Sequence, residues 1–155
     1  MKKMSNLTLI GLLFLIGCVS KESANTKSAD LHGEWRNVYL KITLNEVGGE
    51  SLKVTECDSA HWEQMLGIKP IHTFFNADGS YKSEYYTLND SLFMTNTGRW
   101  EISNDTLTMT QITPVAGVYK LKTSIEGSLA TFEGMIDFDG DGKPDDHYLG
   151  RQRKR

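Results

Sequence analysis

The chain has 155 residues, a formal net charge of −3 at pH 7, 39% hydrophobic residues and two cysteines. This length suits one domain, which buries about two-thirds of the surface that its unfolded chain exposes. The mild negative charge argues against a nucleic-acid partner, and two cysteines allow at most one internal disulfide.

The first 17 residues have the organisation of a secretory signal peptide. Lys2 and Lys3 precede a mostly apolar run over residues 7–17, which is too short to span a bilayer comfortably. The segment Leu15–Cys18 resembles the signal of bacterial lipoproteins, in which a small residue precedes the cysteine. This resemblance implies cleavage before Cys18, a diacylglyceryl thioether on its sulfur and acylation of the new amino terminus. The alternative is an ordinary signal peptide, or an anchor helix, with an incidental cysteine.

A lipidated Cys18 would make membrane attachment stable, because stable anchoring takes about two acyl chains. Val19 follows the cysteine where an aspartate would favour retention in the inner membrane, so we expect an outer-membrane location in the bacterial envelope. The sequence leaves open which face of the membrane the protein occupies. Lipidation would also leave Cys57 without a disulfide partner.

Residues 18–30 are polar and contain almost nothing that could pack, which predicts a flexible lipidated tether. The folded domain is expected over residues 31–152, followed by a basic tail at residues 153–155.

Most of the domain alternates apolar and polar residues with a period of two, which is typical of strands with one buried face. The clearest case is residues 98–110, where Trp100 and Ile102 alternate on one arm and Leu107 and Met109 on the other, around a turn at 104–105. Further strands are expected at residues 33–44, 52–55, 71–75, 81–88, 92–94, 115–123, 129–138 and 147–149.

One segment departs from this alternation. Asp58 can cap a short helix whose apolar face contains Trp62, Met65 and Leu66, and Gly67 can end it. About eight to ten short strands with one helix predict an all-β fold. A meander of sequential hairpins closes most simply as an antiparallel up-and-down barrel, which leaves no exposed edges.

Three short motifs resemble the lipocalin-like domains of bacterial lipoproteins. They are Gly33-x-Trp35, the hairpin at residues 75–81, and Gly98-x-Trp100 followed by residues 105–108. The resemblance covers residues 31–152 and implies that Gly33 and Trp35 plug the closed end of the barrel. It also implies a binding module that holds a small hydrophobic or amphipathic molecule at the open end.

Aromatic residues on the alternating rows are the candidates for the wall of such a ligand cavity. The candidate ligand-binding residues are Phe75, Tyr85, Phe93, Trp100 and Phe132. The alternative is that these residues only fill the core, since barrels of about eight strands are either filled or hold one small ligand.

An acidic stretch at residues 137–146 has the spacing of a calcium-binding loop. Oxygen ligands would come from the side chains of Asp137, Asp139, Asp141 and Asp145 and from the carbonyl of Lys143. Tyr148 stands where an EF-hand has its bidentate glutamate, and no flanking helices are expected, so an EF-hand proper is not predicted. The alternative is a solvated acidic turn.

No motif for a nucleophile, a phosphate-binding loop or a zinc site is present in the sequence. We therefore expect a protein that is not an enzyme and requires no cofactor, calcium being the one possible ion. The rival to ligand binding is a structural or interaction protein of the envelope, with a filled barrel and a calcium-stabilised loop. The oligomeric state is not predicted.

Overall fold

The computed structural model describes residues 30–45 and 53–155. The signal peptide, the lipidation site at Cys18, nearly all of the tether and the turn after the first strand lie outside the described residues. In the part of the chain that is described, no helix is both long and apolar enough to cross a membrane.

The described residues form nine antiparallel strands and one short helix, after a helical turn at Asp30 and Leu31. The strands are β1 (Gly33–Thr43), β2 (Val54–Asp58), β3 (His72–Phe75), β4 (Ser80–Tyr86), β5 (Leu92–Ser103), β6 (Thr106–Thr113), β7 (Gly117–Glu126), β8 (Leu129–Ile136) and β9 (Asp146–Lys154), and the helix is α2 (Trp62–Leu66).

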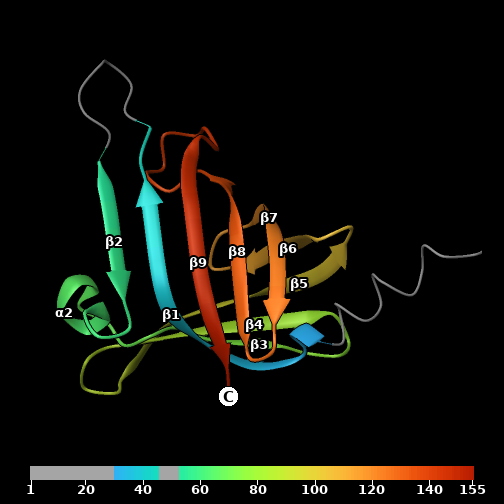
Figure 1. Cartoon of the computed structure of the whole chain (residues 1–155), viewed down its shortest axis with the longest axis horizontal. Coiled ribbons are helices and arrows are strands. Elements are labelled where there is room, and N and C mark those ends of the chain that lie inside the picture. Colours follow the sequence, from blue (N-terminus) through green and yellow to red (C-terminus); the bar gives the residue numbers. More distant parts are fainter. Residues whose placement is uncertain (1–29, 46–52) are drawn as a thin grey trace, which may run out of the picture.

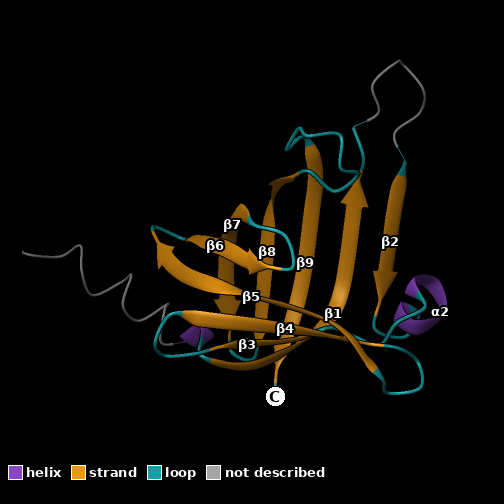
Figure 2. Cartoon of the chain, turned by 180° about the vertical axis from the view of Figure 1, so that it is seen from behind, coloured by secondary structure: helices purple, strands orange, loops and turns teal. Residues whose placement is uncertain are grey.

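Eight of these strands close into a barrel, which confirms the predicted fold class. Strands β3 to β9 pair with their neighbours in chain order, and β9 then pairs with β1. The long strand β1 pairs with β3 through residues 33–36 and with β2 through residues 39–43, so β2 extends the sheet beside the barrel. In Figure 1, β3, β4 and β5 lie across the direction of β1, β8 and β9, and Figure 2 shows the same crossing from behind.

The turns alternate between the two ends of the barrel because every pairing is antiparallel. One end has the turns at residues 76–79, 104–105 and 127–128, together with Leu31, and we call it the closed end. The other end has the loops at residues 87–91, 114–116 and 137–145, and we call it the open end.

Tightly packed aromatic and aliphatic side chains fill the closed end. Trp35 is fully buried there, and its indole N–H donates a hydrogen bond of 2.7 Å to the carbonyl of Leu31. Gly33 begins β1 with φ of 119°, a conformation that suits glycine. The buried core consists of Leu31, Trp35, Phe75, Tyr81, Trp100, Leu107, Leu121, Ala130 and Phe132.

Three local expectations were wrong. Residues 95–97, which separate the expected strands at 92–94 and 98–110, were not expected in a strand, but they lie within β5, a continuous strand of 12 residues. In the helix α2, Trp62 is buried as expected, whereas Met65 is 51% exposed and the helix packs beside β2. Asp58 accepts hydrogen bonds from the N–H groups of Ala60 and His61 in the turn before the helix, so it does not cap α2 itself.

Candidate functional site

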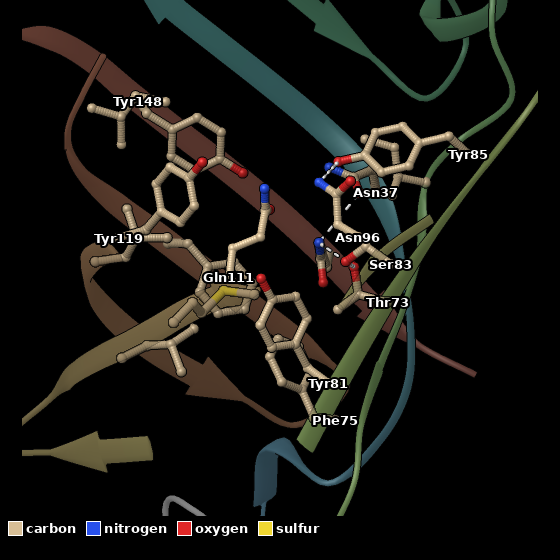
Figure 3. Close-up of a pocket in the computed structure, with 17 residues that line it drawn as sticks. Asn37, Thr73, Phe75, Tyr81, Ser83, Tyr85, Asn96, Gln111, Tyr119 and Tyr148 are labelled. Atoms are coloured by element: carbon tan, nitrogen blue, oxygen red, sulfur yellow. Dashed lines mark hydrogen bonds between the residues drawn. The ribbon is translucent and has the colours of Figure 1, made fainter. Parts of the chain in front are cut away.

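A cavity of about 250 Å³ occupies the barrel between the closed-end core and the open end (Figure 3). Its lining comes from all eight barrel strands and from Ile71, just before β3. The lining residues are Asn37, Ile71, Thr73, Phe75, Tyr81, Ser83, Tyr85, Asn96, Leu107, Met109, Gln111, Tyr119, Leu121, Phe132, Ile136, Tyr148 and Gln152.

The side of the cavity toward the closed end is apolar. Phe75, Leu107, Leu121 and Phe132 form this floor, and each is at most 7% exposed. The Phe75 ring lies 6.5 Å from that of Phe132 and 5.3 Å, edge to face, from that of Trp100 beneath it. The floor can therefore hold an apolar group and has no hydrogen-bonding side chain of its own.

Uncharged polar side chains cross the cavity wall on five adjacent strands, from β9 through β1, β3 and β4 to β5. This polar belt consists of Gln152, Asn37, Thr73, Ser83 and Asn96. Register places each member opposite or next to the following one: Gln152 opposite Asn37, Thr73 opposite Ser83, and Ser83 opposite Asn96. Buried polar groups are costly in a filled core, so a continuous belt of them is a feature of the cavity wall.

Hydrogen bonds join most of the belt. The Gln152 amide donates to Asn37 Oδ1 at 3.2 Å and to Thr73 Oγ1 at 3.5 Å, and the Thr73 and Ser83 hydroxyls are 3.0 Å apart. Asn96 donates to the Tyr85 hydroxyl at 3.3 Å. Two buried amide oxygens, Gln152 Oε1 and Asn96 Oδ1, have no hydrogen-bond partner among the described residues.

Four phenol groups, those of Tyr81, Tyr85, Tyr119 and Tyr148, line the remainder of the cavity (Figure 3). Burial raises the pKa of Tyr81 and that of Tyr148 to about 12 each, and burial also raises the pKa of Tyr85. The phenols of Tyr81, Tyr85 and Tyr148 are therefore neutral at physiological pH and act as hydrogen-bonding groups.

A glycine makes room for one of these rings. The Tyr148 ring folds back over Gly150, two residues along β9, and its hydroxyl occupies the position that a Cβ on residue 150 would need. Gly150 thus permits Tyr148 to lie against the cavity wall.

The structure brings three of the five predicted ligand-binding residues to the cavity, namely Phe75, Tyr85 and Phe132. Trp100 lies beneath the floor, where its indole N–H donates to the carbonyl of Asn76 at 3.2 Å. Phe93 is 53% exposed at the start of β5, toward the open end, and is not among the lining residues.

The aromatic residues from which the cavity wall was predicted give no indication of the polar belt. A usable signal was present: Asn37 follows Trp35 on the inward row of β1, and Ser83 lies between Tyr81 and Tyr85 on that of β4. A polar residue on an inward-facing row indicates a cavity or a hydrogen-bonding partner inside the barrel, where a fully packed core would have an apolar residue.

The acidic loop at the open end has an arrangement different from the predicted ligand set. Carboxylate oxygens of Asp137, Asp139 and Asp146 lie within 4.8 Å of one another, and Asp146 was not a predicted ligand. Asp141 instead accepts from the Lys143 ammonium at 2.9 Å, and Asp145 accepts from the Asn45 side chain at 3.1 Å.

Asp146 is fully buried and ties this loop to the end of β1. It accepts hydrogen bonds from the backbone N–H groups of Asn45 at 3.0 Å, Phe138 at 2.8 Å and Asp139 at 3.2 Å. These hydrogen bonds hold the pKa of the Asp146 carboxyl below its ordinary value, and the bond from Asn45 has the largest effect.

Comparison with solved structures supports the fold. The chain is similar to a lipocalin-like protein from Bacteroides uniformis, with a TM-score of 0.50 and 13% sequence identity, over 81% of this chain and 99% of that one. No protein-family model and no curated protein sequence matches the chain. At this identity the likeness concerns the fold alone, and the closed barrel of eight strands agrees with it.

Proposed function

Because the chain has a lipocalin-like barrel, we propose that it binds a small hydrophobic or amphipathic molecule in the cavity and performs no catalysis. The observation that carries this proposal is the cavity of about 250 Å³ inside a barrel whose closed end is densely packed. Ligand sites in proteins are concave, mostly apolar and supplied with a few placed polar groups. The apolar floor and the polar belt together match that description.

Apolar side chains at the open end add support. Leu88, Leu92, Phe93, Ile112, Val115 and Phe138 are each 48–70% exposed and lie on or beside the loops of that end. An apolar rim would favour the approach of an amphipathic molecule to the cavity.

Reducing the cavity without altering the outer wall tests the proposal. In β4, Ser83 lines the cavity and its neighbour Lys82 lies on the outside, over the Phe74 ring. We expect native mass spectrometry of the purified protein to show a bound small molecule that is lost on denaturation. Ser83→Met should abolish this extra mass, and Lys82→Met should retain it. An extra mass that is equally abundant in both variants would contradict binding in the cavity.

We also propose that the protein is an envelope lipoprotein, attached to the outer membrane through Cys18. Support comes from residues 1–18, in which two lysines are followed by an apolar run and then by the cysteine. In bacteria grown with a labelled palmitate, the full chain should carry the label and sediment with membranes, and Cys18→Ala should do neither. Label on the Cys18→Ala variant would rule out this site.

A second candidate is an interaction protein of the envelope, stabilised by calcium in the acidic loop. The observation favouring it is the convergence of Asp137, Asp139 and Asp146. An ion that binds only the folded state stabilises it by about 2.7 kcal/mol at a hundredfold excess over Kd.

Thermal unfolding with and without calcium tests the second candidate. The melting temperature should rise with calcium, and Asp139→Asn should abolish the rise. Glu126→Gln removes one exposed carboxylate at the closed end and should leave the rise unchanged. Equal melting temperatures with calcium and with a chelator would exclude a calcium role.

A further inference from the structure

We propose that the cavity selects an uncharged molecule with an apolar end and a polar head that donates hydrogen bonds. This inference rests on the binding function proposed above and adds the chemical class of the ligand. An alcohol or a primary or secondary amide on a short hydrocarbon or aromatic body has this chemistry.

The charge of the ligand follows from the wall. None of the described residues that line the cavity is charged, and the phenols of Tyr81, Tyr85 and Tyr148 are neutral at physiological pH. An ionised carboxylate or ammonium group moved from water into this site would lose its hydration without gaining an opposite charge, which is unfavourable. The wall therefore discriminates against anionic and cationic head groups.

The donor character of the head follows from the belt. Gln152 is 8% exposed and Asn96 is half-buried, and their side-chain amides line the cavity while their oxygens have no donor. An acceptor buried without a partner is unfavourable. Both oxygens lie beneath the cavity surface, so a ligand hydroxyl or amide N–H would supply the missing donor when the side-chain amide turns its oxygen toward the cavity, and the phenol hydroxyls could donate in return.

The position of the two zones orients the ligand. The floor of Phe75, Leu107, Leu121 and Phe132 lies toward the closed end, whereas Tyr119 and Gln111 come from the parts of β6 and β7 nearest the open end. The apolar end would therefore enter first. The volume lies just below the range of about 300–1,000 Å³ that is usual for ligand pockets, so the body of the ligand is small.

Four matched probes test the inference: 3-phenylpropan-1-ol, 3-phenylpropionamide, 3-phenylpropionate and propylbenzene. All carry the same aromatic body and differ in the head group. Binding is measured at pH 7 by isothermal titration calorimetry on the purified full chain, with the same detergent at the same concentration for all four probes. We expect the alcohol and the amide to bind at least tenfold more tightly than the carboxylate, and more tightly than propylbenzene.

Each outcome decides between the two proposals. If the carboxylate binds as tightly as the amide, or propylbenzene as tightly as the alcohol, the selectivity is wrong and the binding function stands. If none of the four binds, the binding function itself is contradicted.

Variants of the belt link the selectivity to named residues. Asn96→Leu and Gln152→Met should each weaken binding of the alcohol at least fivefold without weakening binding of propylbenzene. Gln64→Met, on the exposed surface of α2, should change neither. If a folded belt variant loses affinity for the alcohol and for propylbenzene equally, the substitution acts through packing. That result would overturn the assigned role of the belt residue in selecting the head group.

A charge introduced at the cavity provides a test in the opposite direction. The Gln111 side chain extends into the open space in Figure 3. Gln111→Arg should therefore make 3-phenylpropionate the preferred probe over the amide. If 3-phenylpropionate still binds more weakly than the amide in this variant, the lack of a positive charge in the cavity is not the reason that the carboxylate is disfavoured.

Discussion

Gly98 lies where neighbouring groups leave no space for a side chain. A Cβ on this residue would overlap the carbonyl oxygen of Thr110 and would lie 2.8 Å from Cε1 of Tyr81 and 2.9 Å from the Cα of Gln111. Since Tyr81 and Gln111 both line the cavity, this close approach of β5 to β6 also shapes the site.

Gly98→Ala should therefore destabilise the protein by about 1–3 kcal/mol, the usual cost of overpacking a well-packed position. Chemical denaturation measures the change in the free energy of unfolding. Gly117→Ala is the control, because its Cβ would meet nothing closer than 3.4 Å, from the Tyr119 hydroxyl. Equal effects of the two substitutions would mean that the close contact at Gly98 is relieved at no cost.

The raised pKa values of Tyr81 and Tyr148 predict a loss of stability in alkali. Both phenols titrate at about 12 in the folded protein and near 10 when unfolded. Between these values the unfolded state binds fewer protons, so stability is fully present below pH 10 and falls as the pH rises toward 12. Tyrosinate absorbance should show at least two phenols that ionise only above pH 11, and Tyr148→Phe should remove one of them.

Among the elements, β5 shows how a strand can look like a turn in sequence. Thr95, Asn96 and Thr97 are polar and separate two more apolar segments, yet they pair with Glu84, Ser83 and Lys82 of β4. Asn96 faces the cavity as part of the polar belt, which explains why a polar residue occurs in the inward row.

The loop between β8 and β9 depends on a single buried carboxylate. Asp146 accepts hydrogen bonds from the backbone N–H groups of Phe138 and Asp139 at the start of the loop and from that of Asn45, just after β1. Its lowered pKa means that this contribution is present above the ordinary value of 3.8 and is lost as the pH falls below it.

Asp146→Asn should therefore lower the melting temperature at pH 7 and make it less sensitive to acid than that of the wild type. The reason is that an amide oxygen is a weaker acceptor, and its NH₂ group would face backbone donors. Melting temperatures measured between pH 7 and pH 3 test this, with Glu126→Gln as the matched control. Parallel curves for Asp146→Asn and the wild type would contradict the role of this carboxylate.

At the scale of the whole molecule, the barrel exists because the last strand returns to the first. β9 pairs with β1 from Trp35 opposite Lys154 to Thr43 opposite His147. The same strand also supplies Tyr148 and Gln152 to the cavity, so the pairing that closes the barrel also completes the site.

Deleting residues 151–155 should open the barrel and abolish cooperative unfolding, because half of the β1–β9 ladder and Gln152 of the polar belt are removed together. Circular dichroism and thermal melting measure the loss. Arg153→Gln removes an exposed charge from the same segment and should leave both unchanged. A deletion variant that melts cooperatively at the wild-type temperature would show that closure by β9 is dispensable.

The sequence by itself determined the fold class, most strands and the presence of one short helix. It could do so because alternation along a strand and glycine-rich turns are local properties, as the hairpin at residues 98–110 illustrates. The register between distant strands, in contrast, is set by packing of the whole barrel. Only the tertiary structure could place Gln152 beside Asn37, or Asp146 beside Asp137 and Asp139, because these residues approach one another through pairing and loop closure that no short segment encodes.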